Sequence, residues 1–351
     1  MRPTTLRPRV VSWFVMLSFV SFILSPRALA AIYTTFDIPL ATQGIEVVAV
    51  NNSGQVAGWY WDAEGRTHGF LWQPNGQLTT IDIPGGSEVF IWGMNNLGKI
   101  VGSYNDANGV HHGFLRNLAG KLTTLNPPFA YWKYGSFALA INDVGQIAGE
   151  YIDQNGQDNA YLRQADGTYV AFDPPNSYQV ISVLINQNGQ IAGWYTSQPG
   201  GTNNEHVFLR EVDGTISNFD VPGYSAPEPL ALGADGSIAG IAQDAAFIYH
   251  DFLRDALGTV TVFDVPNGRA NYDWPVGVTD AGNLIGRFLY SSGRAYRGWQ
   301  RGPGGTFTYF RDPNAGTFEY QGTAPTCASG NGKVAGLYYD SQNAIHGFVK
   351  H

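Results

Sequence analysis

The sequence predicts an all-β protein, and more specifically a seven-bladed β-propeller with four antiparallel strands per blade. Two observations predict this fold. A pentapeptide bounded by glycines recurs seven times at intervals of 44 to 50 residues, and the two ends of the chain fall at complementary points of the repeat. Short strands recurring with a period of about 45 residues are typical of propeller blades.

The pentapeptide has the form Gly-x-(Ile/Val/Leu)-(Ala/Val/Ile)-Gly. Its first glycine ends a turn that needs a positive φ, and its second lies inside a strand, where glycine usually marks close approach of a neighbour. We therefore expect both glycines to be structural. The copies are Gly54–Gly58, Gly98–Gly102, Gly145–Gly149, Gly189–Gly193, Gly236–Gly240, Gly282–Gly286 and Gly332–Gly336.

The first full repeat shows the four strands of one unit. Each strand is a run of four to six residues rich in Val, Ile, Thr and aromatic residues, and each is bounded by Gly, Asn, Asp or Pro. No comparable window has helical periodicity. The predicted strands are Glu46–Val50, Gln55–Tyr60, His68–Trp72 and Leu78–Ile83.

The N-terminal strand Tyr33–Pro39 has the pattern of a fourth strand without the three that should precede it. The chain ends just after a third strand, His346–Val349, with no fourth strand to follow. We therefore expect Tyr33–Pro39 to complete the last blade, which would remove two exposed sheet edges. A solenoid, the competing repeat architecture, would need distinctive caps, and none is evident.

Residues 1–30 have the pattern of a secretory signal peptide. Three arginines precede the apolar run Val10–Leu24, and Ala28–Ala30 supplies small residues for cleavage. The alternative is a retained membrane anchor, but the run is shorter than the ~20 residues that a spanning helix needs. We expect a single mature domain, residues 31–351, that is secreted or periplasmic, monomeric and not inserted in the membrane.

Charge and composition exclude several classes of function. The formal charge of −8 becomes about −12 without residues 1–30, which argues against nucleic-acid partners. The single cysteine, Cys327, allows no intrachain disulfide, and we expect it to be a small buried side chain. No phosphate-binding loop or catalytic motif is present, so we expect no cofactor. Acidic turns such as Asp62–Gly65 lack the further ligands of a calcium loop, so we expect no metal.

The unit Ile-Asn-x-x-Gly-x-Ile-x-Gly-x-Tyr followed by His-Gly-Phe resembles the bacterial extracellular His-Ala-Phe (HAF) repeat class. The second motif occurs at His68, His112 and His346, and the resemblance covers the whole mature chain. It implies export and a repeated β fold, and it implies no particular activity. Two repeats depart from the motif, with His250-Asp251-Phe252 and Arg297-Gly298-Trp299.

Most histidines follow the repeat and are expected to be structural. We expect them to hydrogen-bond an Asp near a fourth strand, because one residue per blade around a ring cannot converge on one site. The exceptions are His351 and His111. The histidines at the shared position are His68, His112, His206, His250 and His346.

The segments that join one blade to the next do not repeat, and they are rich in aromatic and acidic residues. Such side chains suit sugar rings, whose apolar faces stack while their hydroxyls form hydrogen bonds. The alternative is that these aromatics only fill spaces between blades. The candidate ligand-binding residues are Trp92, Tyr131, Trp132, Lys133, Tyr272, Asp273, Trp274, Glu319 and Tyr320.

The sequence therefore predicts an exported binding module that holds a glycan, or an extracellular or envelope protein, on its loop-lined face. The alternative is a polysaccharide lyase or hydrolase with its site at the mouth of the central channel. In that case the catalytic candidates are His111, Tyr134 and Arg287, with the arginine neutralising a uronate. A purely structural role in the envelope is a third possibility.

Overall fold

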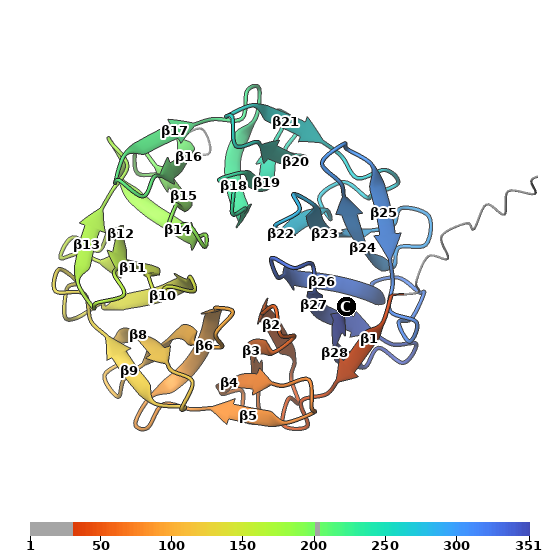
Figure 1. Ribbon diagram of the computed structural model, residues 1–351, viewed down its shortest axis with the longest axis horizontal. Coiled ribbons are helices and arrows are strands. Elements are labelled where there is room, and N and C mark those ends of the chain that lie inside the picture. The colour runs from red at the N-terminus through yellow and green to blue at the C-terminus, as the bar shows by residue number, and fades with distance from the viewer. Residues whose placement is uncertain (1–30, 201–203) are drawn as a thin grey trace, which may run out of the picture. The chain divides into compact units, whose positions relative to one another are not determined.

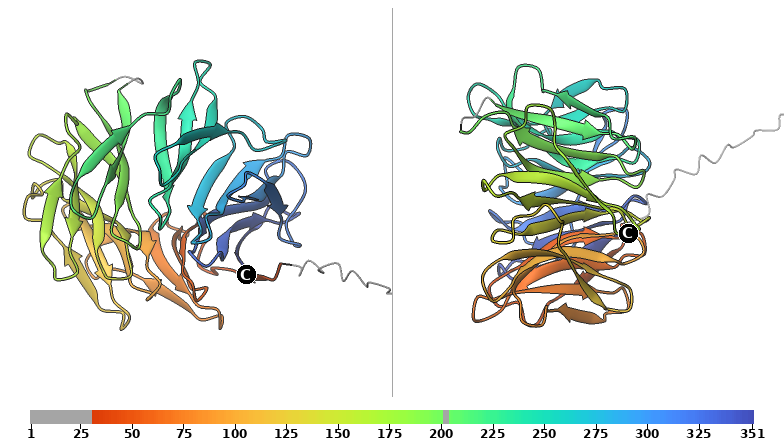
Figure 2. Two further views of the ribbon diagram at one scale, coloured as in Figure 1. Left: turned by 45° about the horizontal axis from the view of Figure 1, so that its top comes forward. Right: turned by 90° about the vertical axis from the view of Figure 1, so that its left-hand side faces the viewer.

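The computed structural model describes residues 31–200 and 204–351, which form 28 β-strands and no helix. The predicted signal peptide, residues 1–30, lies outside the described residues. Within residues 32–351 the sheets are arranged radially around an axis, with β2, β6, β10, β14, β18, β22 and β26 innermost (Figure 1). Turned views show the twisted sheets standing side by side (Figure 2). The described residues contain no helix long and apolar enough to cross a bilayer.

Five sheets have four antiparallel strands each, in sequence order. The first two consist of β2 (Ile45–Val50), β3 (Val56–Trp61), β4 (Thr67–Trp72), β5 (Leu78–Ile81), β6 (Ser87–Met94), β7 (Ile100–Asn105), β8 (His111–Arg116) and β9 (Leu122–Leu125). The other three consist of β10 (Ser136–Ile141), β11 (Ile147–Ile152), β12 (Asp158–Arg163), β13 (Tyr169–Phe172), β14 (Gln179–Ile185), β15 (Ile191–Thr196), β16 (Glu205–Arg210), β17 (Ile216–Phe219), β18 (Ser225–Leu232), β19 (Ile238–Gln243), β20 (Tyr249–Arg254) and β21 (Val260–Phe263).

The remaining strands form one eight-stranded sheet where the sequence predicted two separate ones. Its two groups of four, β22–β25 and β26–β28 with β1, are joined by a single parallel pairing of Tyr296 with Gly322. Gly322 has a positive φ, and its backbone lies directly against that of Tyr296. The strands are β1 (Tyr33–Phe36), β22 (Trp274–Val278), β23 (Leu284–Leu289), β24 (Tyr296–Arg301), β25 (Phe307–Phe310), β26 (Gly322–Ala328), β27 (Val334–Tyr339) and β28 (Ile345–Lys350).

The second glycine of each pentapeptide lies on the second strand of its group, where there is no room for a side chain. A Cβ on Gly149 would overlap the carbonyl oxygen of Phe137 on β10 and the ring of Tyr161 on β12. The same overlap, with the first-strand carbonyl and a third-strand aromatic, occurs at Gly58, Gly102 and Gly193. The rings that fill this space come from the third strand.

Close approach at these glycines coincides with a β-bulge in the neighbouring inner strand. The register of β10 against β11 shifts between Ala138 and Ala140. Each of the other six innermost strands has a comparable shift against its partner. A bulge bends a strand and re-aims its side chains, so the glycine and the bulge together set the direction of the residues nearest the axis.

The predicted histidine role is confirmed. In each case Nδ1–H donates to an acceptor in the segment after a fourth strand, which ties the third strand to that segment. At His112 the acceptor is an asparagine instead of an aspartate. The pairs and their distances are His68–Asp82 (2.6 Å), His112–Asn126 (2.9 Å), His206–Asp220 (2.7 Å), His250–Asp264 (2.7 Å) and His346–Asp37 (2.6 Å).

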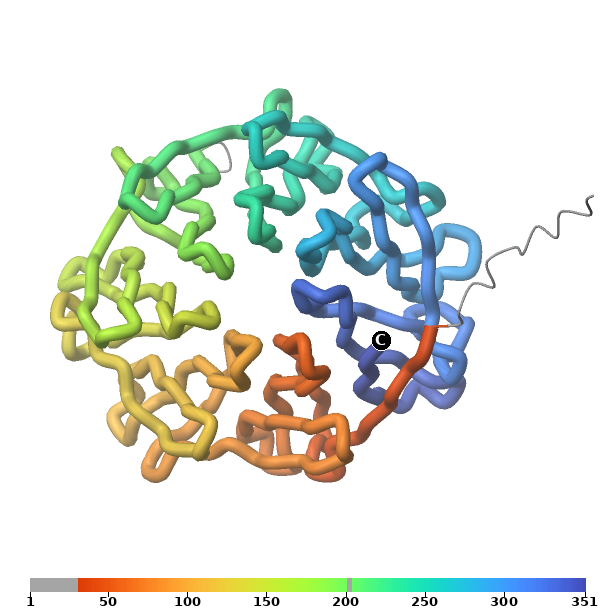
Figure 3. Tube along the Cα trace, in the orientation of Figure 1, coloured from red at the N-terminus to blue at the C-terminus, as the bar shows by residue number. Residues whose placement is uncertain are grey.

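The N-terminal strand pairs where the sequence predicted. The four residues Tyr33–Phe36 run antiparallel to β28, so the first and last strands of the described chain are neighbours (Figure 3). The ring of Phe36 also stacks on Trp72 of β4, with centroids 4.7 Å apart. Thr326 of β26 donates a hydrogen bond of 2.6 Å to the carbonyl oxygen of Val47 on β2. Strand β1 thus belongs to the last group of strands, and packing and hydrogen bonding connect that group to the first repeat.

Cys327 lies in the apolar cluster between β2 and β26, as a free and buried thiol. Burial raises its pKa to about 12, so the thiolate is not formed at neutral pH. The prediction of a small buried side chain is confirmed.

We expect Gly149→Val to destabilise the protein by about 1–3 kcal/mol, because the added side chain must displace a backbone carbonyl and a buried ring. The measurement is the melting temperature of the purified protein. Gly304→Val is the matched control, since a Cβ there meets nothing within 4 Å. Equal melting temperatures for the two variants would contradict the packing role of Gly149.

Candidate functional site

One side-chain position near the axis varies in chemistry from repeat to repeat although the backbone around it repeats. It is the residue directly after each pentapeptide, and it pairs across the sheet with a residue of the innermost strand. Its occupants range from tryptophan to glutamate and arginine, so the fold does not require a particular side chain there. The pairs are Trp59–Glu46, Ser103–Phe90, Glu150–Phe137, Trp194–Ser182, Ile241–Glu228, Arg287–Trp274 and Leu337–Ala324.

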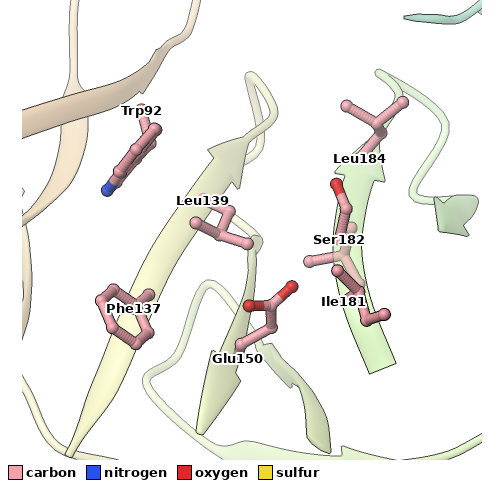
Figure 4. Close-up of a pocket in the computed structure, with 8 residues that line it drawn as sticks. Trp92, Phe137, Leu139, Glu150, Ile181, Ser182 and Leu184 are labelled. Carbon is pink, nitrogen blue, oxygen red and sulfur yellow. The ribbon is translucent and has the colours of Figure 1, made fainter. Parts of the chain in front are cut away.

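A pocket of about 430 Å³ lies among three of these innermost strands. Figure 4 shows its walls: Trp92 from β6, Phe137 and Leu139 from β10, and residues 181–184 from β14, with Glu150 of β11 between them. The wall is mostly apolar. Glu150 is its only ionisable residue, so this pocket combines aromatic surfaces with one carboxyl group.

Glu150 is 8% exposed, and its Oε1 is buried without a hydrogen-bond partner. Burial raises its pKa well above the usual value, and the nearby negative charge of Asp158 raises it further. Asp158 itself has a raised pKa, because it is partly buried and lies near Asp153. An isolated buried carboxylate is costly, so burial favours the protonated form of this group, which can donate a hydrogen bond.

Trp92 presents an aromatic surface at the edge of the pocket in a fixed orientation. Its indole is 39% exposed, and Nε1–H donates a 2.8 Å hydrogen bond to Oγ of Ser103. The ring of Phe90 stacks against it, with centroids 5.9 Å apart and planes 27° apart. A tryptophan held on two sides loses little entropy when a ligand stacks on its free surface.

His111 contacts Phe137, one residue of the pocket wall, and the segment Tyr131–Tyr134 precedes its backbone partner Gly135. The ring of His111 packs on Phe137 at 4.8 Å, and its backbone pairs with Gly135, which directly follows Tyr134. Burial lowers the pKa of His111, which Glu88 opposes, so the imidazole is mainly neutral at pH 7.

The segment itself is an exposed aromatic cluster. The ring of Tyr131 contacts those of Trp132 and Tyr134 at 5.7 and 5.4 Å. Trp132 is 76% exposed, and the Lys133 ammonium lies 5.8 Å from the Tyr134 ring.

The other predicted residues gather in a second cluster around β22 and β23. Arg287 lies over the ring of Trp274 at 5.5 Å. Glu319 accepts a 2.8 Å hydrogen bond from Arg294, and the backbone N–H of Tyr320 donates to the carbonyl of Arg294. Arg269 lies over Tyr272 at 4.8 Å, and its Nη1 is 4.0 Å from Glu319 Oε1.

The structure places two candidates differently from the sequence analysis. Trp92 and Trp274 belong to strands β6 and β22 and not to the segments between sheets, because each inner strand begins earlier than its β-branched residues indicate. The three catalytic candidates do not lie together. Strand β8, which contains His111, and strand β23, which contains Arg287, lie on opposite sides of the axis (Figure 1).

Sequence reasoning missed Glu150 and Phe137, although one signal was available. Glu150 follows Gly149 directly, and it is the only acid at that position among the seven repeats. Glu150 lies inside a regular strand, and its cross-strand partner Phe137 has the pattern of an ordinary strand residue, so neither stands out among the segments between blades.

Asp251 is a second departure from the repeat with physical consequences. It replaces the glycine of His-Gly-Phe on β20, is 2% exposed, and has no hydrogen-bond partner for either carboxyl oxygen. Burial raises its pKa well above the usual value, and Asp273 and Asp264 add to the shift. Burial also raises the pKa of Asp273, to about 8, so this predicted ligand-binding residue faces partly inward.

We expect the protein to lose stability as the pH rises from about 4 to about 8. Asp251 and Asp273 keep their protons in the folded state, whereas in the unfolded chain they ionise near pH 4, so folding binds protons and is opposed at higher pH. Asp251→Asn removes one of these groups. Its melting temperature should therefore decline less steeply than that of the wild type between pH 5 and 8 in calorimetric scans. Parallel declines would contradict the burial of an uncompensated acid.

The described residues contain no group of three or more His, Cys, Asp or Glu side chains placed to hold a metal ion. Acidic turns use their carboxylates locally instead. Asp62 Oδ1, for example, accepts hydrogen bonds from the backbone N–H groups of Glu64 and Arg66. This is the local turn geometry that such residues usually adopt.

No family model and no curated protein matches this sequence. Solved structures match at low sequence identity. The β-propeller domain of the Trilobed protease from Pyrococcus furiosus has a TM-score of 0.60 and 11% identity, over 87% of this chain and 95% of that one. That domain is described as having an open velcro topology, whereas here β1 pairs with β28.

Two enzymes match over only part of their length. Acylaminoacyl peptidase from Pyrococcus horikoshii has a TM-score of 0.55 and 10% identity, over 87% of this chain and 51% of that one. A puromycin hydrolase has a TM-score of 0.55 and 13% identity, over 89% and 54%. This chain thus spans about half the length of these enzymes. At such identities the similarity establishes the fold alone: the protein has a β-propeller scaffold.

Proposed function

We propose that the protein is an exported, monomeric, seven-bladed β-propeller that binds a glycan noncovalently in the pocket between β6, β10 and β14. The pattern of residues 1–30 supports export. The HAF resemblance points the same way and stays a prediction.

The blade count is supported by the two halves of the eight-stranded sheet. Each half has the strand order of the five separate sheets, and one pairing at Gly322 joins them. Treated as two blades, they bring the total to seven, with β1 as the outer strand of the last blade. The contacts of Phe36 with Trp72 and of Thr326 with Val47 support closure of this ring.

The observation that carries the proposal is the placement of Trp92 and Phe137 on the walls of a pocket that also contains the carboxyl group of Glu150. Aromatic surfaces stack on the C–H groups of a sugar ring, and a buried carboxyl group can hydrogen-bond a hydroxyl.

A glycan suits the pocket better than a protein partner does. A stable protein–protein interface needs about 800 Å² from each partner, with a broad apolar centre. The pocket is a concave site of about 430 Å³, within the size range of small-molecule sites.

A polysaccharide lyase is less well supported by this geometry. Such an enzyme would need a proton acceptor and a cation for the uronate within one site. His111 and Tyr134 lie next to the backbone pairing of His111 with Gly135. Arg287 belongs to the cluster around β22 and β23, where it packs on Trp274. The pocket wall itself contains no cation.

We expect Trp92→Ala to weaken glycan binding about tenfold or more, because the variant removes a stacking surface. The measurement is calorimetric titration of the purified protein with oligosaccharides that an array screen identifies as ligands. Leu257→Ala, at a residue that is 93% exposed on an outer turn, is the control and should bind normally. Unchanged affinity in Trp92→Ala would place the ligand elsewhere.

The same preparations distinguish binding from catalysis. Incubation with acidic polysaccharides should release no new unsaturated or reducing ends. Release that disappears in His111→Ala would establish the enzyme and contradict the binding module.

A further inference from the structure

The pocket contains one group whose charge state determines what can enter it. Glu150 lies between β10 and β14 with its carboxyl group among the side chains of Phe137, Leu139 and residues 181–184 (Figure 4). Its Oε1 is buried and has no partner within the protein. A buried polar atom without a partner is rare, and a ligand that completes its hydrogen bonding removes the cost.

The scaffold does not explain this carboxyl group. The corresponding residue is Trp, Ser, Trp, Ile, Arg or Leu in the other six repeats, and the strands around it have the same register. The fold therefore accepts an apolar residue at this position. The repeated structure does not require a glutamate at position 150.

The side chains that line the pocket offer Glu150 no cation with which a carboxylate could form an ion pair. None of the other residues that line the pocket carries a charge. The charged group that acts on it is Asp158 of the neighbouring strand β12, which is itself acidic. His111 packs on Phe137, the cross-strand partner of Glu150, and its imidazole is mainly neutral at pH 7. Burial thus favours the protonated carboxyl group, an O–H donor, and no cationic side chain lines the pocket to receive an anion.

We propose that Glu150, as the only ionisable residue of the pocket wall, is the specificity-determining residue of this pocket and selects uncharged sugar rings over uronic acids. This inference rests on the proposed glycan-binding function. A neutral sugar accepts the hydrogen bond from Glu150 through a hydroxyl or ring oxygen and loses little solvation. A uronate would have to bury its carboxylate beside an acid with no compensating cation, which is strongly unfavourable.

The test compares three classes of oligosaccharide of equal length, namely neutral hexose, uronic-acid and amino-sugar tetramers, by calorimetric titration at pH 6 and pH 9. The wild type should bind a neutral tetramer and bind uronates at least tenfold more weakly. Glu150→Gln keeps a donor of nearly the same shape and should retain neutral binding within about threefold. Glu150→Leu loses the donor and should weaken binding about tenfold.

The pH dependence of the affinity shows whether Glu150 acts as a hydrogen-bond donor or only fills space in the pocket. Ionisation of Glu150 removes the donor, so any fall in wild-type affinity for the neutral tetramer as the pH rises should be absent in Glu150→Gln. Glu228→Gln is the matched control, since Glu228 is also a partly buried acid on an inner strand but does not line the pocket. It should follow the wild type. Thermal melts of each variant report whether the fold is kept.

The outcomes are distinct. Uronates that bind as tightly as neutral tetramers would overturn the role of Glu150 and leave glycan binding intact. Amino-sugar tetramers that bind most tightly, and lose affinity in Glu150→Gln, would show an ionised Glu150 pairing with a cation and would also overturn it. No binding of any tetramer would overturn the proposed function together with this inference.

Discussion

The contact on which the rest of the structure depends is the one between the second pentapeptide glycine and the carbonyl oxygen of the strand beside it. At Gly149 the oxygen of Phe137 occupies the space of a side chain, and a third-strand ring closes the other side. The inner strand must bulge there. Because the contact recurs in every repeat, it gives the sheets one common shape and places one variable residue of each opposite the innermost strand.

This constraint separates the scaffold from the chemistry. The glycine contacts and the histidine–aspartate hydrogen bonds recur from repeat to repeat, and the pairing of β1 with β28 joins the two ends of the chain. These features leave the side chains on the inner strands free to vary. Three neighbouring repeats use that freedom to build an aromatic pocket around Glu150. Another repeat places Arg287 and Trp274 against each other, which makes a separate cluster. Asp251 shows that a departure from the repeat sequence can also destabilise the fold, because it buries a carboxyl group without a hydrogen-bond partner.

Much of the fold was predictable because it depends on local patterns. The period, the turn residues and the unmatched strand Tyr33–Phe36 are visible in the sequence, and so is the pairing of His68 with Asp82. The pocket was only half predictable. Trp92 and His111 were identified from their irregularity, but Glu150 was not, because burial without a partner is a property of three-dimensional packing. The joining of β1 and β22–β28 into one eight-stranded sheet depends on the single pairing of Gly322 with Tyr296. No sequence pattern indicates this pairing.

The most direct test of the account is a crystal structure of the protein with a bound neutral oligosaccharide. The account predicts a sugar ring against Trp92 and Phe137, with one of its oxygens within hydrogen-bonding distance of the Glu150 carboxyl group. A sugar bound at the cluster around Trp274 and Arg287, or on the outer edge of a sheet with the Glu150 pocket empty, would contradict it.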